Sequence, residues 1–593
     1  MAGHYTEAGN GEQATPYLLE AGDRARQLFA YREAARSYRR AVPFLKEQGQ
    51  LELAAKTLMK LGLAYHSDFE FEKSREAYDE AFTLFHQIAE EDRPAIPLAE
   101  QPLRMAFSEP VLDHGLTNLT YSTALTRQLF SGLLKRDVNY FDVLPDIAVR
   151  WEVLDGGRRY IFHLRDDVSW SDGKPLTAHD FEYAWKRILD PETESPNAEL
   201  LYDLRGARAY HQGELADSAP VGVLAQDDST LIVTLEGPAG YFLHLLSSGQ
   251  TFPVPKHVVE RHGPAWTDEA NIVTCGSFRV ESHEPGKSIV LLRDPDYRGP
   301  RRGNIMRVEI PILTAEEWYP TEKEMYFADR LDILLINNLP PPERKRVIQQ
   351  NAGEYLQTPQ TSTRYVQFDE SRPPYNDRRV RRALSMAIDR DTLANVALQG
   401  YVLPAIGGFI PPGIAGHSEG ISLPYDPVKA RRLFAEAGYP DGNGFPKVQT
   451  VLTSSRYPSI EYIATSWRDQ LGLDVSYRMI NEKPDLRFHI WTMGWLDDYP
   501  DPDNFMRASP ISLVAGGQKQ DEYDDLVERA RRSMNQEERI ELYKRADQIL
   551  VEEAVIVPLT HSSNQILVKP WLKNVIGPLL DQGPWKDFVI EPH

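Results

Sequence analysis

The residues that could carry out chemistry do not form a catalytic set. The sequence has no Gly-x-x-x-x-Gly-Lys phosphate-binding loop and no His-Glu-x-x-His metal pair. His257 and His262 lie five residues apart without further candidate ligands, which disfavours a metal site. Cys275 is the single cysteine and is expected to be a small buried apolar residue. Because no nucleophile can be paired with a base, we expect a protein that is not an enzyme and holds neither a cofactor nor a metal.

Composition describes a folded and acidic chain. Of its 593 residues, 41% are apolar and 26% are charged, and the formal net charge is −21. These values are typical of a globular protein and disfavour binding to nucleic acid or insertion into an anionic membrane. No apolar run approaches the roughly 18 residues that a membrane-spanning helix needs.

The elements that must position any binding residue begin with a helical segment at residues 1–93. Gly22, Ala34, Tyr38 and Ala41 recur 40 residues later as Gly62, Ser74, Tyr78 and Ala81. Small residues let paired helices approach each other, and the aromatic ring fills the groove between them. The spacing resembles that of the tetratricopeptide repeat, although that repeat has about 34 residues and an alanine where Ser74 stands. A plain helical hairpin is the alternative.

The helical segment is expected to end at a proline-rich linker. Pro94, Pro97 and Pro102 remove backbone donors and disfavour helix, so we assign the linker to residues 94–102. We expect the chain after the linker to have a complete core of its own. The repeats would then offer a surface for a protein partner.

The N-terminus bears on the cellular location. The first residues lack the basic start and apolar core of an export signal. The sequence as written therefore predicts a cytoplasmic protein, and an extracytoplasmic one if Met1 follows a removed export signal. Because the repeats begin part-way through a unit, we also expect the chain to be the C-terminal part of a longer signalling protein.

From Leu103 onward the patterns of strands and helices alternate. Residues 150–164 read as two strands around an Asp-Gly-Gly turn. Thr177 and Asp180 form a capping-box start for a helix, and Asp377 begins another. The fold class is therefore mixed α/β, preceded by an α-helical repeat domain.

Six stretches of this region carry longer motifs, among them Gly494-Trp-Leu-Asp-Asp-Tyr499. They are residues 144–153, 162–178, 380–390, 409–413, 430–439 and 494–502. In this order they resemble the extracellular solute-binding proteins of family 5, the oligopeptide- and dipeptide-binding group of ABC importers. The resemblance extends from about Leu103 to Pro558.

The resemblance implies a periplasmic-binding-protein-like clamshell of the large peptide-binding type, over residues 103–593. One lobe would comprise about 103–121, 247–349 and 546–593, with a subdomain at about 122–246. The second lobe would comprise about 350–545. The ligand would be held between the lobes.

The resemblance also implies a site. In this family the ligand peptide pairs with protein backbone as an added strand, and its ammonium group meets an aspartate of the Gly-Trp-x-x-Asp-Tyr motif. That aspartate maps to Asp498, with Asp497 as its neighbour. The backbone of Met493, Gly494 and Trp495 would supply the pairing edge. The alternatives are that the two aspartates cap a turn and that the tryptophan belongs to the core.

Glu109 is a further candidate, since the family places its first cleft-entering loop at this point. Its carboxylate could accept ligand amides or pair with a basic residue; a solvated loop residue is the alternative. Between Leu473 and His489 the chain is short for the family, which leaves the ligand class open. We therefore expect a non-enzymatic protein that binds a peptide or a similar small solute, as a ligand sensor or transport receptor. A regulatory scaffold that binds proteins but no small ligand is the alternative.

Overall fold

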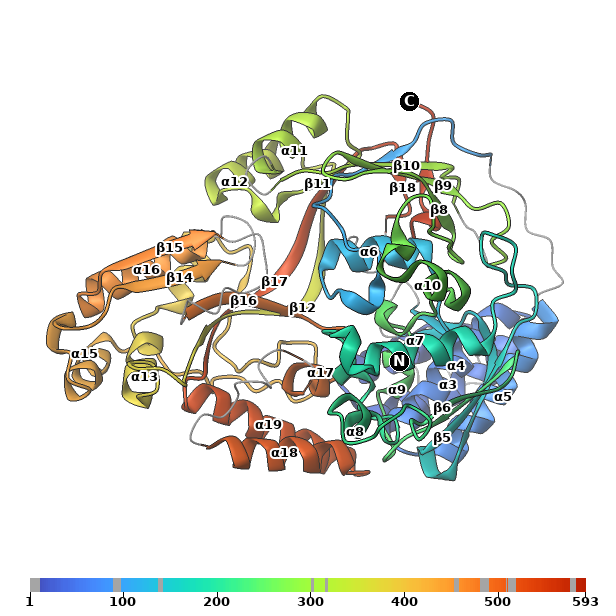
Figure 1. Cartoon of the computed structure of the whole chain (residues 1–593), viewed down its shortest axis with the longest axis horizontal. Coiled ribbons are helices and arrows are strands. Elements are labelled where there is room, and N and C mark those ends of the chain that lie inside the picture. Colours follow the sequence, from blue (N-terminus) through green and yellow to red (C-terminus); the bar gives the residue numbers. More distant parts are fainter. Residues whose placement is uncertain are drawn as a thin grey trace. The chain divides into compact units, whose positions relative to one another are not determined.

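The chain folds into two units, as the computed structural model describes it (Figure 1). Unit 1 comprises residues 1–313, 534–536 and 571–593, and unit 2 comprises residues 314–533 and 537–570. The described residues are 11–88, 97–136, 142–299, 303–314, 318–452, 458–479, 490–507, 509, 519–575 and 583–593. Parts of the predicted linker and of the shortened stretch before residue 490 therefore lie outside the described residues.

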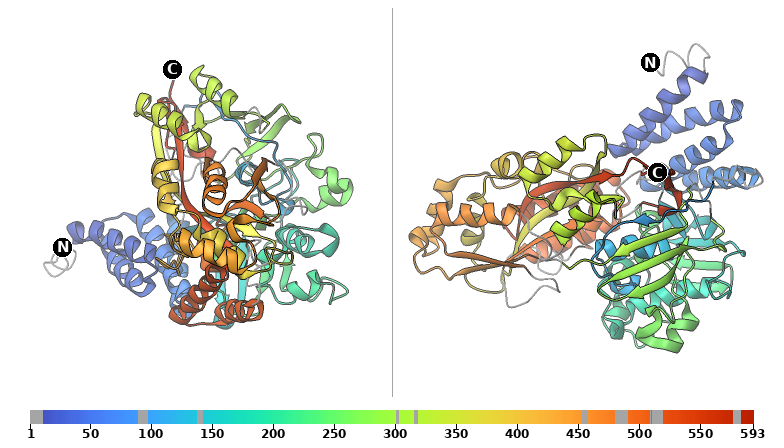
Figure 2. Two further views of the ribbon diagram at one scale, coloured as in Figure 1. Left: turned by 90° about the vertical axis from the view of Figure 1, so that its left-hand side faces the viewer. Right: turned by 90° about the horizontal axis from the view of Figure 1, so that it is seen from above.

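The described part of unit 1 begins with four helices, which Figure 2 shows side by side: α2 (Gly11–Gln27), α3 (Tyr31–Glu47), α4 (Leu51–Ser67) and α5 (Phe71–Ile88). The predicted small and aromatic positions meet as expected. A Cβ atom added at Gly62 would lie 2.5 Å from the Tyr78 ring, and Gly22 faces the Tyr38 ring in the same way. The Ser74 hydroxyl donates a hydrogen bond to the Gly62 carbonyl at 2.9 Å. The close approach of the helices thus explains why these positions are glycine and serine.

The helices pack against a four-stranded antiparallel sheet of the same unit. Its strands are β4 (Ala148–Leu154), β5 (Arg159–Leu164), β6 (Val223–Asp227) and β7 (Thr230–Thr234), in the order β4-β5-β7-β6. The predicted capping box of Thr177 and Asp180 begins helix α7 (Ala178–Leu189), which covers β6 and β7. Helix α5 covers β4, where the Trp151 ring contacts the rings of Tyr78 and Phe82 at centroid distances of 5.0 and 4.8 Å.

Polar groups also join the helices to the sheet. Buried His66 hydrogen-bonds the Gly240 carbonyl through Nδ1 at 3.1 Å and the Tyr160 hydroxyl through Nε2 at 2.9 Å. Buried Arg26 forms an ion pair with buried Asp142. The repeat helices thus bury part of the sheet of the α/β region, and whether that region also has a complete core of its own stays a prediction. Local sequence patterns carry no signal for such contacts between distant segments.

A second sheet of unit 1 joins the first strand after the repeat helices to three strands from the middle of the chain. It has the order β1-β10-β9-β8, formed by β1 (Leu103–Arg104), β10 (Arg307–Pro311), β9 (Ser288–Arg293) and β8 (Phe278–Glu284). Near the C-terminus, β18 (Leu572–Lys573) pairs with β19 (Val589–Ile590), and Asn304 exchanges two hydrogen bonds with the backbone of Ile590. The remaining elements of this unit are α6 (Thr120–Leu129), β2 (Leu134–Arg136), β3 (Val143–Pro145), α8 (Ala207–His211), α9 (Phe242–Leu245) and α10 (Lys256–His262).

Unit 2 is built on one large sheet. Its order is β11-β17-β12-β16-β14-β15, and β13 (Leu403–Pro404) also pairs with β17. The strands are β11 (Ile333–Leu335), β12 (Tyr355–Phe368), β14 (Val448–Leu452), β15 (Val475–Met479), β16 (Ile490–Leu496) and β17 (Ile556–Val568). Two hydrophobic clusters form the core: one contains Val366 and the other its neighbour Tyr365. Because successive residues of a strand point to opposite faces, the clusters lie on opposite faces of the sheet.

Helices cover both faces of this sheet. The helices that contribute to the Val366 cluster are α13 (Arg378–Met386), α15 (Pro427–Glu436) and α16 (Pro458–Leu471). Those that contribute to the Tyr365 cluster are α17 (Pro502–Met506), α18 (Gln520–Arg532) and α19 (Gln536–Glu552). The unit also contains α11 (Trp318–Phe327), α12 (Pro341–Gln350) and α14 (Arg390–Thr392). Asp377 caps α13 by accepting a hydrogen bond from the Arg379 amide, as predicted.

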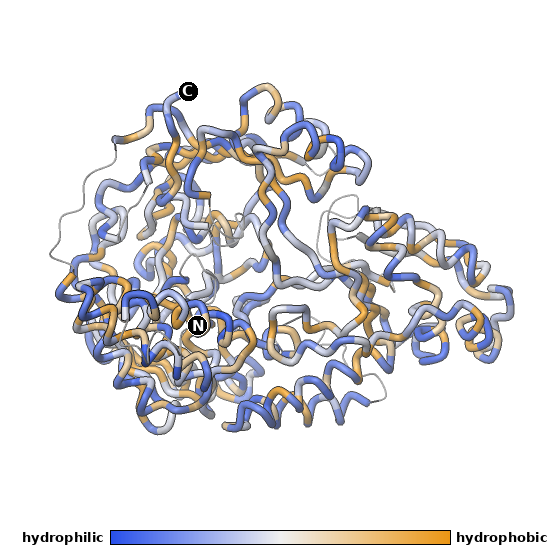
Figure 3. Tube along the Cα trace, turned by 180° about the vertical axis from the view of Figure 1, so that it is seen from behind, coloured by the Kyte–Doolittle hydropathy of each residue, from blue (hydrophilic) through white to orange (hydrophobic). Residues whose placement is uncertain are grey.

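Hydrophobic and hydrophilic residues alternate along the helices and strands of both units (Figure 3). Among the described residues, no helix combines the length and the apolar character that crossing a membrane requires.

Candidate ligand-binding site

Strand β16 combines a paired edge with an edge that is only partly paired. On one side, β12 pairs with β16 from Ile490 to Leu496. On the other side, β14 pairs only with Ile490, Trp491 and Thr492. Within the described residues, the stretch from Met493 to Leu496 therefore has no strand neighbour on that side. Such an edge presents backbone donors and acceptors to which an extended peptide can add.

The side chains of this stretch alternate between the two faces of the sheet. Met493 and Trp495 lie on the Tyr365 side and pack, partly buried, against that hydrophobic cluster. Gly494 is exposed and Leu496 is half-buried. The tryptophan therefore contributes to the core, while its indole Nε1 donates a 2.8 Å hydrogen bond to Asn504.

The two adjacent aspartates after β16 have different surroundings. Asp497 is 2% exposed, and its carboxylate accepts a hydrogen bond from the Thr361 hydroxyl. Its amide donates to the Thr361 carbonyl at 3.3 Å, so that both groups attach the end of β16 to β12. Asp498 is half-buried. Of the two, Asp498 has the carboxylate that is more accessible to a ligand.

Asn504 fixes the orientation of Asp498. Its side-chain oxygen accepts from the Asp498 amide at 3.2 Å, and its Nδ2 donates to Asp498 Oδ2 at 3.2 Å. The same oxygen also accepts the hydrogen bond from Trp495 Nε1. Asn504 itself is fully buried. One buried amide thus links the pairing strand to the carboxylate that follows it. The sequence patterns did not identify this residue, because an asparagine inside a short helix carries no motif.

A network of buried charges holds the loop that contains Asp498. Asp501 caps α17 by accepting from the Asp503 amide at 2.9 Å, and Arg539 donates to Asp501 at 3.0 Å. Asp503 accepts from Arg507 and from two tyrosine hydroxyls, those of Tyr499 and Tyr543, at distances of 2.6 to 2.7 Å. The capping role that we considered for Asp497 and Asp498 is thus filled here by Asp501.

Burial and ion pairing act on these carboxylates in opposite directions. Burial raises the pKa of Asp501 despite its contact with Arg539. Burial also acts to raise the pKa of Asp503, but the Arg507 charge and the hydrogen bonds together lower it to about 2. Asp503 is therefore ionised at neutral pH, and its charge is balanced within the protein.

Glu109 lies in unit 1 and is bound by a hairpin there. Its Oε1 is 2.9 Å from His283 Nε2, and its Oε2 accepts from the Gly286 amide at 2.6 Å. The side chain is 45% exposed. The carboxylate thus joins the loop after β1 to the β8–β9 turn. Whether it also meets ligand stays a prediction.

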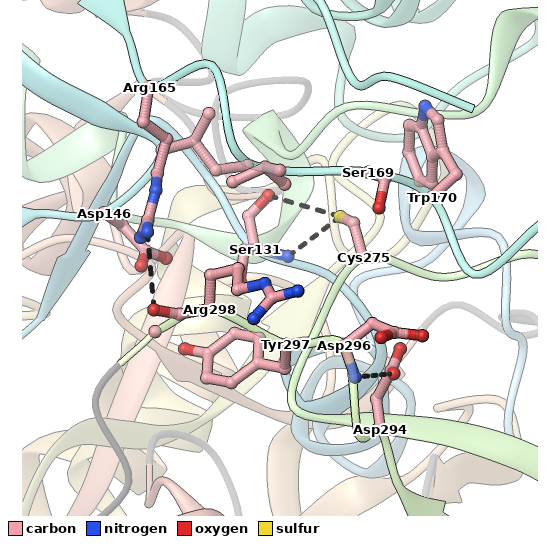
Figure 4. Close-up of a pocket in the computed structure, with 13 residues that line it drawn as sticks. Ser131, Asp146, Arg165, Ser169, Trp170, Cys275, Asp294, Asp296, Tyr297 and Arg298 are labelled. Atoms are coloured by element: carbon pink, nitrogen blue, oxygen red, sulfur yellow. Dashed lines mark hydrogen bonds between the residues drawn. The ribbon is translucent and has the colours of Figure 1, made fainter. Parts of the chain in front are cut away.

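Unit 1 also contains a small cavity, which Figure 4 shows. Its lining includes Ser131, Arg165, Cys275, Asp294 and Tyr297. Its volume of about 20 Å³ is room for a single water molecule. The Cys275 sulfur lies 3.4 Å from the Ser131 amide nitrogen, and burial raises the pKa of its thiol. Cys275 is therefore a buried thiol, as predicted, rather than an activated nucleophile.

The other residues considered for chemistry have structural partners. His257 lies 2.8 Å from an Asp172 carboxylate oxygen. One Gly-x-Ser-x-Gly spacing, which is typical of a hydrolase nucleophile, occurs at residues 416–420. The segment is a loop without the strand-to-helix turn of a nucleophile elbow, and the Ser418 hydroxyl donates to the Gly416 carbonyl at 3.3 Å. No cluster of three or more metal-binding side chains occurs among the described residues.

Comparison with known proteins decides the family. The model for bacterial extracellular solute-binding proteins, family 5, matches residues 142–512, which is 371 of 593 residues. The chain belongs to this family. The model for soluble NSF attachment proteins matches residues 1–94, which supports the predicted helical repeats.

Two relatives each share 32% sequence identity with this chain. The periplasmic oligopeptide-binding protein OppA of Salmonella typhimurium aligns over 476 residues, covering 76% of this chain and 85% of the relative. The probable deoxycholate-binding periplasmic protein YgiS of Escherichia coli aligns over 509 residues, covering 81% and 92%. The relatives therefore span almost the whole region after the repeats.

Solved structures of the same kind confirm the predicted fold class. Haemophilus influenzae OppA, in complex with the peptide RPPGFSPFR, has 25% identity and a TM-score of 0.75, over 83% of this chain and 99% of that chain. The murein tripeptide-binding protein MppA of Escherichia coli has 27% identity and a TM-score of 0.75, over 84% and 100%. The mixed α/β binding-protein fold with an N-terminal helical domain is thus as expected from the sequence.

Proposed function

We propose that this family 5 protein binds a peptide with a free amino end and acts, without catalysing a reaction, as a transport receptor or ligand sensor. The observation that carries the proposal is the edge of β16 from Met493 to Leu496, which ends at the half-buried carboxylate of Asp498. An added peptide strand would satisfy the backbone groups of this edge. The relatives named for oligopeptides and murein peptides support this choice of ligand.

Asp498 would receive the ammonium group of the peptide. A cation that is taken out of water needs a charged acceptor, because leaving it unpaired costs several kcal/mol. Asn504 holds the Asp498 carboxylate through one of its two oxygens. Asp497 is a poorer candidate, because it is almost fully buried and its carboxylate already accepts a hydrogen bond from the Thr361 hydroxyl.

The first experiment measures binding. Short peptides with free amino ends should raise the melting temperature and remain uncleaved, because binding to the folded state alone stabilises it. Asp498→Asn should weaken binding by about 2–5 kcal/mol, as should N-acetylation of the peptide, and the two losses should not add. An unchanged dissociation constant in the Asn variant would remove Asp498 from the site. The panel should include deoxycholate, because a relative is named for it.

The repeat helices are the second candidate for a binding function. Residues of α2, α4 and α5, such as Arg26, His66 and Tyr78, are buried by contacts inside unit 1. A protein partner would therefore have to use the exposed surface of the helices, where Leu28 is 69% exposed. If peptides, amino acids and deoxycholate all leave the melting temperature unchanged, the regulatory scaffold becomes the better proposal.

The compartment follows from the role. A transport receptor must act outside the cytoplasmic membrane, and the OppA and YgiS relatives are named as periplasmic. A cytoplasmic location would favour a sensor instead. Fractionation of cells that carry the natural gene distinguishes the two.

A further inference from the structure

Arg364 covers the ligand-pairing edge of β16. It lies in β12, where its register partner is Gly494 of β16 on one side and Thr560 of β17 on the other. A Cβ atom added at Gly494 would lie 2.5 Å from Arg364 Nη1 and 2.9 Å from Arg364 Cζ. The guanidinium group therefore extends across β16, over the position that a side chain of residue 494 would fill.

This position is next to the place where a peptide strand would add. Neighbouring strands lie about 4.8 Å apart, so the added strand would be one such spacing beyond Gly494. Side chains of paired residues on adjacent strands approach to about 5 Å. Because Gly494 has no side chain, nothing on β16 separates the Arg364 guanidinium from the ligand residue opposite it.

The two faces of this edge differ in chemistry. On the Tyr365 side, Met493 and Trp495 pack against a hydrophobic cluster. On the opposite side, the exposed Gly494 lies beneath the Arg364 guanidinium, and the half-buried Leu496 lies opposite Ser362. A charged ligand side chain can therefore be received only on the second side.

We infer that Arg364 selects peptides that carry a carboxylate on the residue paired opposite Gly494. This inference rests on the proposed function of β16 as the peptide-binding edge. A guanidinium group binds a carboxylate through two parallel hydrogen bonds, which gives both strength and orientation. Together with Asp498, the site then recognises a peptide with an ammonium group at its start and an acidic side chain further along.

The experiment uses tetrapeptides of alanine with a free amino end. Glutamate is placed at position 2, 3 or 4 in turn, and glutamine is placed at the same positions in matched peptides. Calorimetric titration of the whole chain should show that, at one of the three positions, the peptide with glutamate binds at least ten-fold more tightly than the matched peptide with glutamine. The Arg364→Gln variant should bind both members of that pair within about three-fold of each other. It should also bind the glutamine peptide as tightly as the unchanged protein does.

Further variants separate charge from folding. Arg364→Glu should prefer lysine at the selected position, and Gly494→Ala should reduce the preference for glutamate by displacing the guanidinium group. Circular dichroism shows that each variant is folded, and Arg364→Gln should in addition keep its affinity for the glutamine peptide. A glutamate preference that survives Arg364→Gln, or equal binding of all pairs by the unchanged protein, would overturn the inference. If the unchanged protein binds no peptide, it is the proposed function that fails.

Discussion

Asn504 determines the geometry of the candidate site at the scale of single residues. It is fully buried and hydrogen-bonds Trp495 Nε1 and both the amide and the carboxylate of Asp498. Asn504→Ala should lower the free energy of unfolding by about 2–4 kcal/mol, because buried donors lose their acceptor. Peptide affinity should also fall, since the carboxylate is no longer held. Chemical denaturation and titration calorimetry measure the two effects.

The control for Asn504 is a half-buried amide elsewhere in unit 2 whose hydrogen bond lies at the surface. Gln520 donates only to Asp524 at the surface, so that Gln520→Ala should change neither stability nor affinity. If Asn504→Ala loses stability but binds peptide as tightly as before, Asp498 does not depend on Asn504 for its role.

His66 gives the protein a predictable dependence on pH. Burial lowers the pKa of His66 to about 4, against about 6.5 for an exposed histidine. Below pH 6.5 the unfolded chain therefore binds a proton that the folded chain excludes. The contribution of His66 to the free energy of unfolding should fall by up to about 3 kcal/mol as the pH falls from 6.5 to 4. Burial raises the pKa of Asp547 and of Glu370 to about 7, and these two carboxyls act in the opposite direction over the same range.

Denaturant titrations from pH 4 to pH 8 measure this slope. His66→Gln should flatten it, and part should remain because burial also lowers the pKa of His561 to about 4. A slope that is the same with and without His66 would contradict the assignment.

At the scale of helices and strands, two of the repeat helices contact the same carboxylate, that of Asp142. Arg26 of α2 pairs with Asp142, and Lys60 of α4 lies 3.6 Å from the same carboxylate. Asp142→Asn should destabilise unit 1 by about 3 kcal/mol, because it removes the nearer of two carboxylates beside buried Arg26, the other being that of Asp23 at 4.0 Å. Replacing both Arg26 and Asp142 by leucine should restore part of the loss. Thermal unfolding of the single and double variants measures the coupling.

Single helices and the pairing of neighbouring helices were predictable from the sequence, because the residues that determine them lie close together in the chain. The capping box of Thr177 and Asp180 and the pairing of Gly62 with Tyr78 each depend on a few neighbouring positions. The position of Arg364 over Gly494 was not predictable, since these residues are 130 positions apart and meet only through strand register. For the same reason the sequence did not reveal that Trp151 packs against the repeat helices.

At the scale of the whole molecule, the repeat helices are part of the core of unit 1. Trp151 and Tyr160 are almost fully buried, and each contacts residues of α4 or α5. The assignment of residues 94–102 as a linker between two domains remains a prediction. The packing nevertheless gives a physical reason to expect that cutting the chain there changes stability.

A chain that begins at Leu98 tests this dependence. It should unfold at a lower temperature than the whole chain, because exposing each buried aromatic side chain costs about 1.5–3 kcal/mol. Asp142 would in addition lose both of its cationic partners. Two calorimetric transitions should be resolved, with the loss confined to unit 1 and the transition of unit 2 unchanged.

In the whole chain, Tyr78→Ala should reproduce part of the loss, whereas Leu53→Ala, at a 40% exposed position of α4, should not. If the shortened chain is as stable as the whole one, the region after the linker has a sufficient core and the helices are an independent domain.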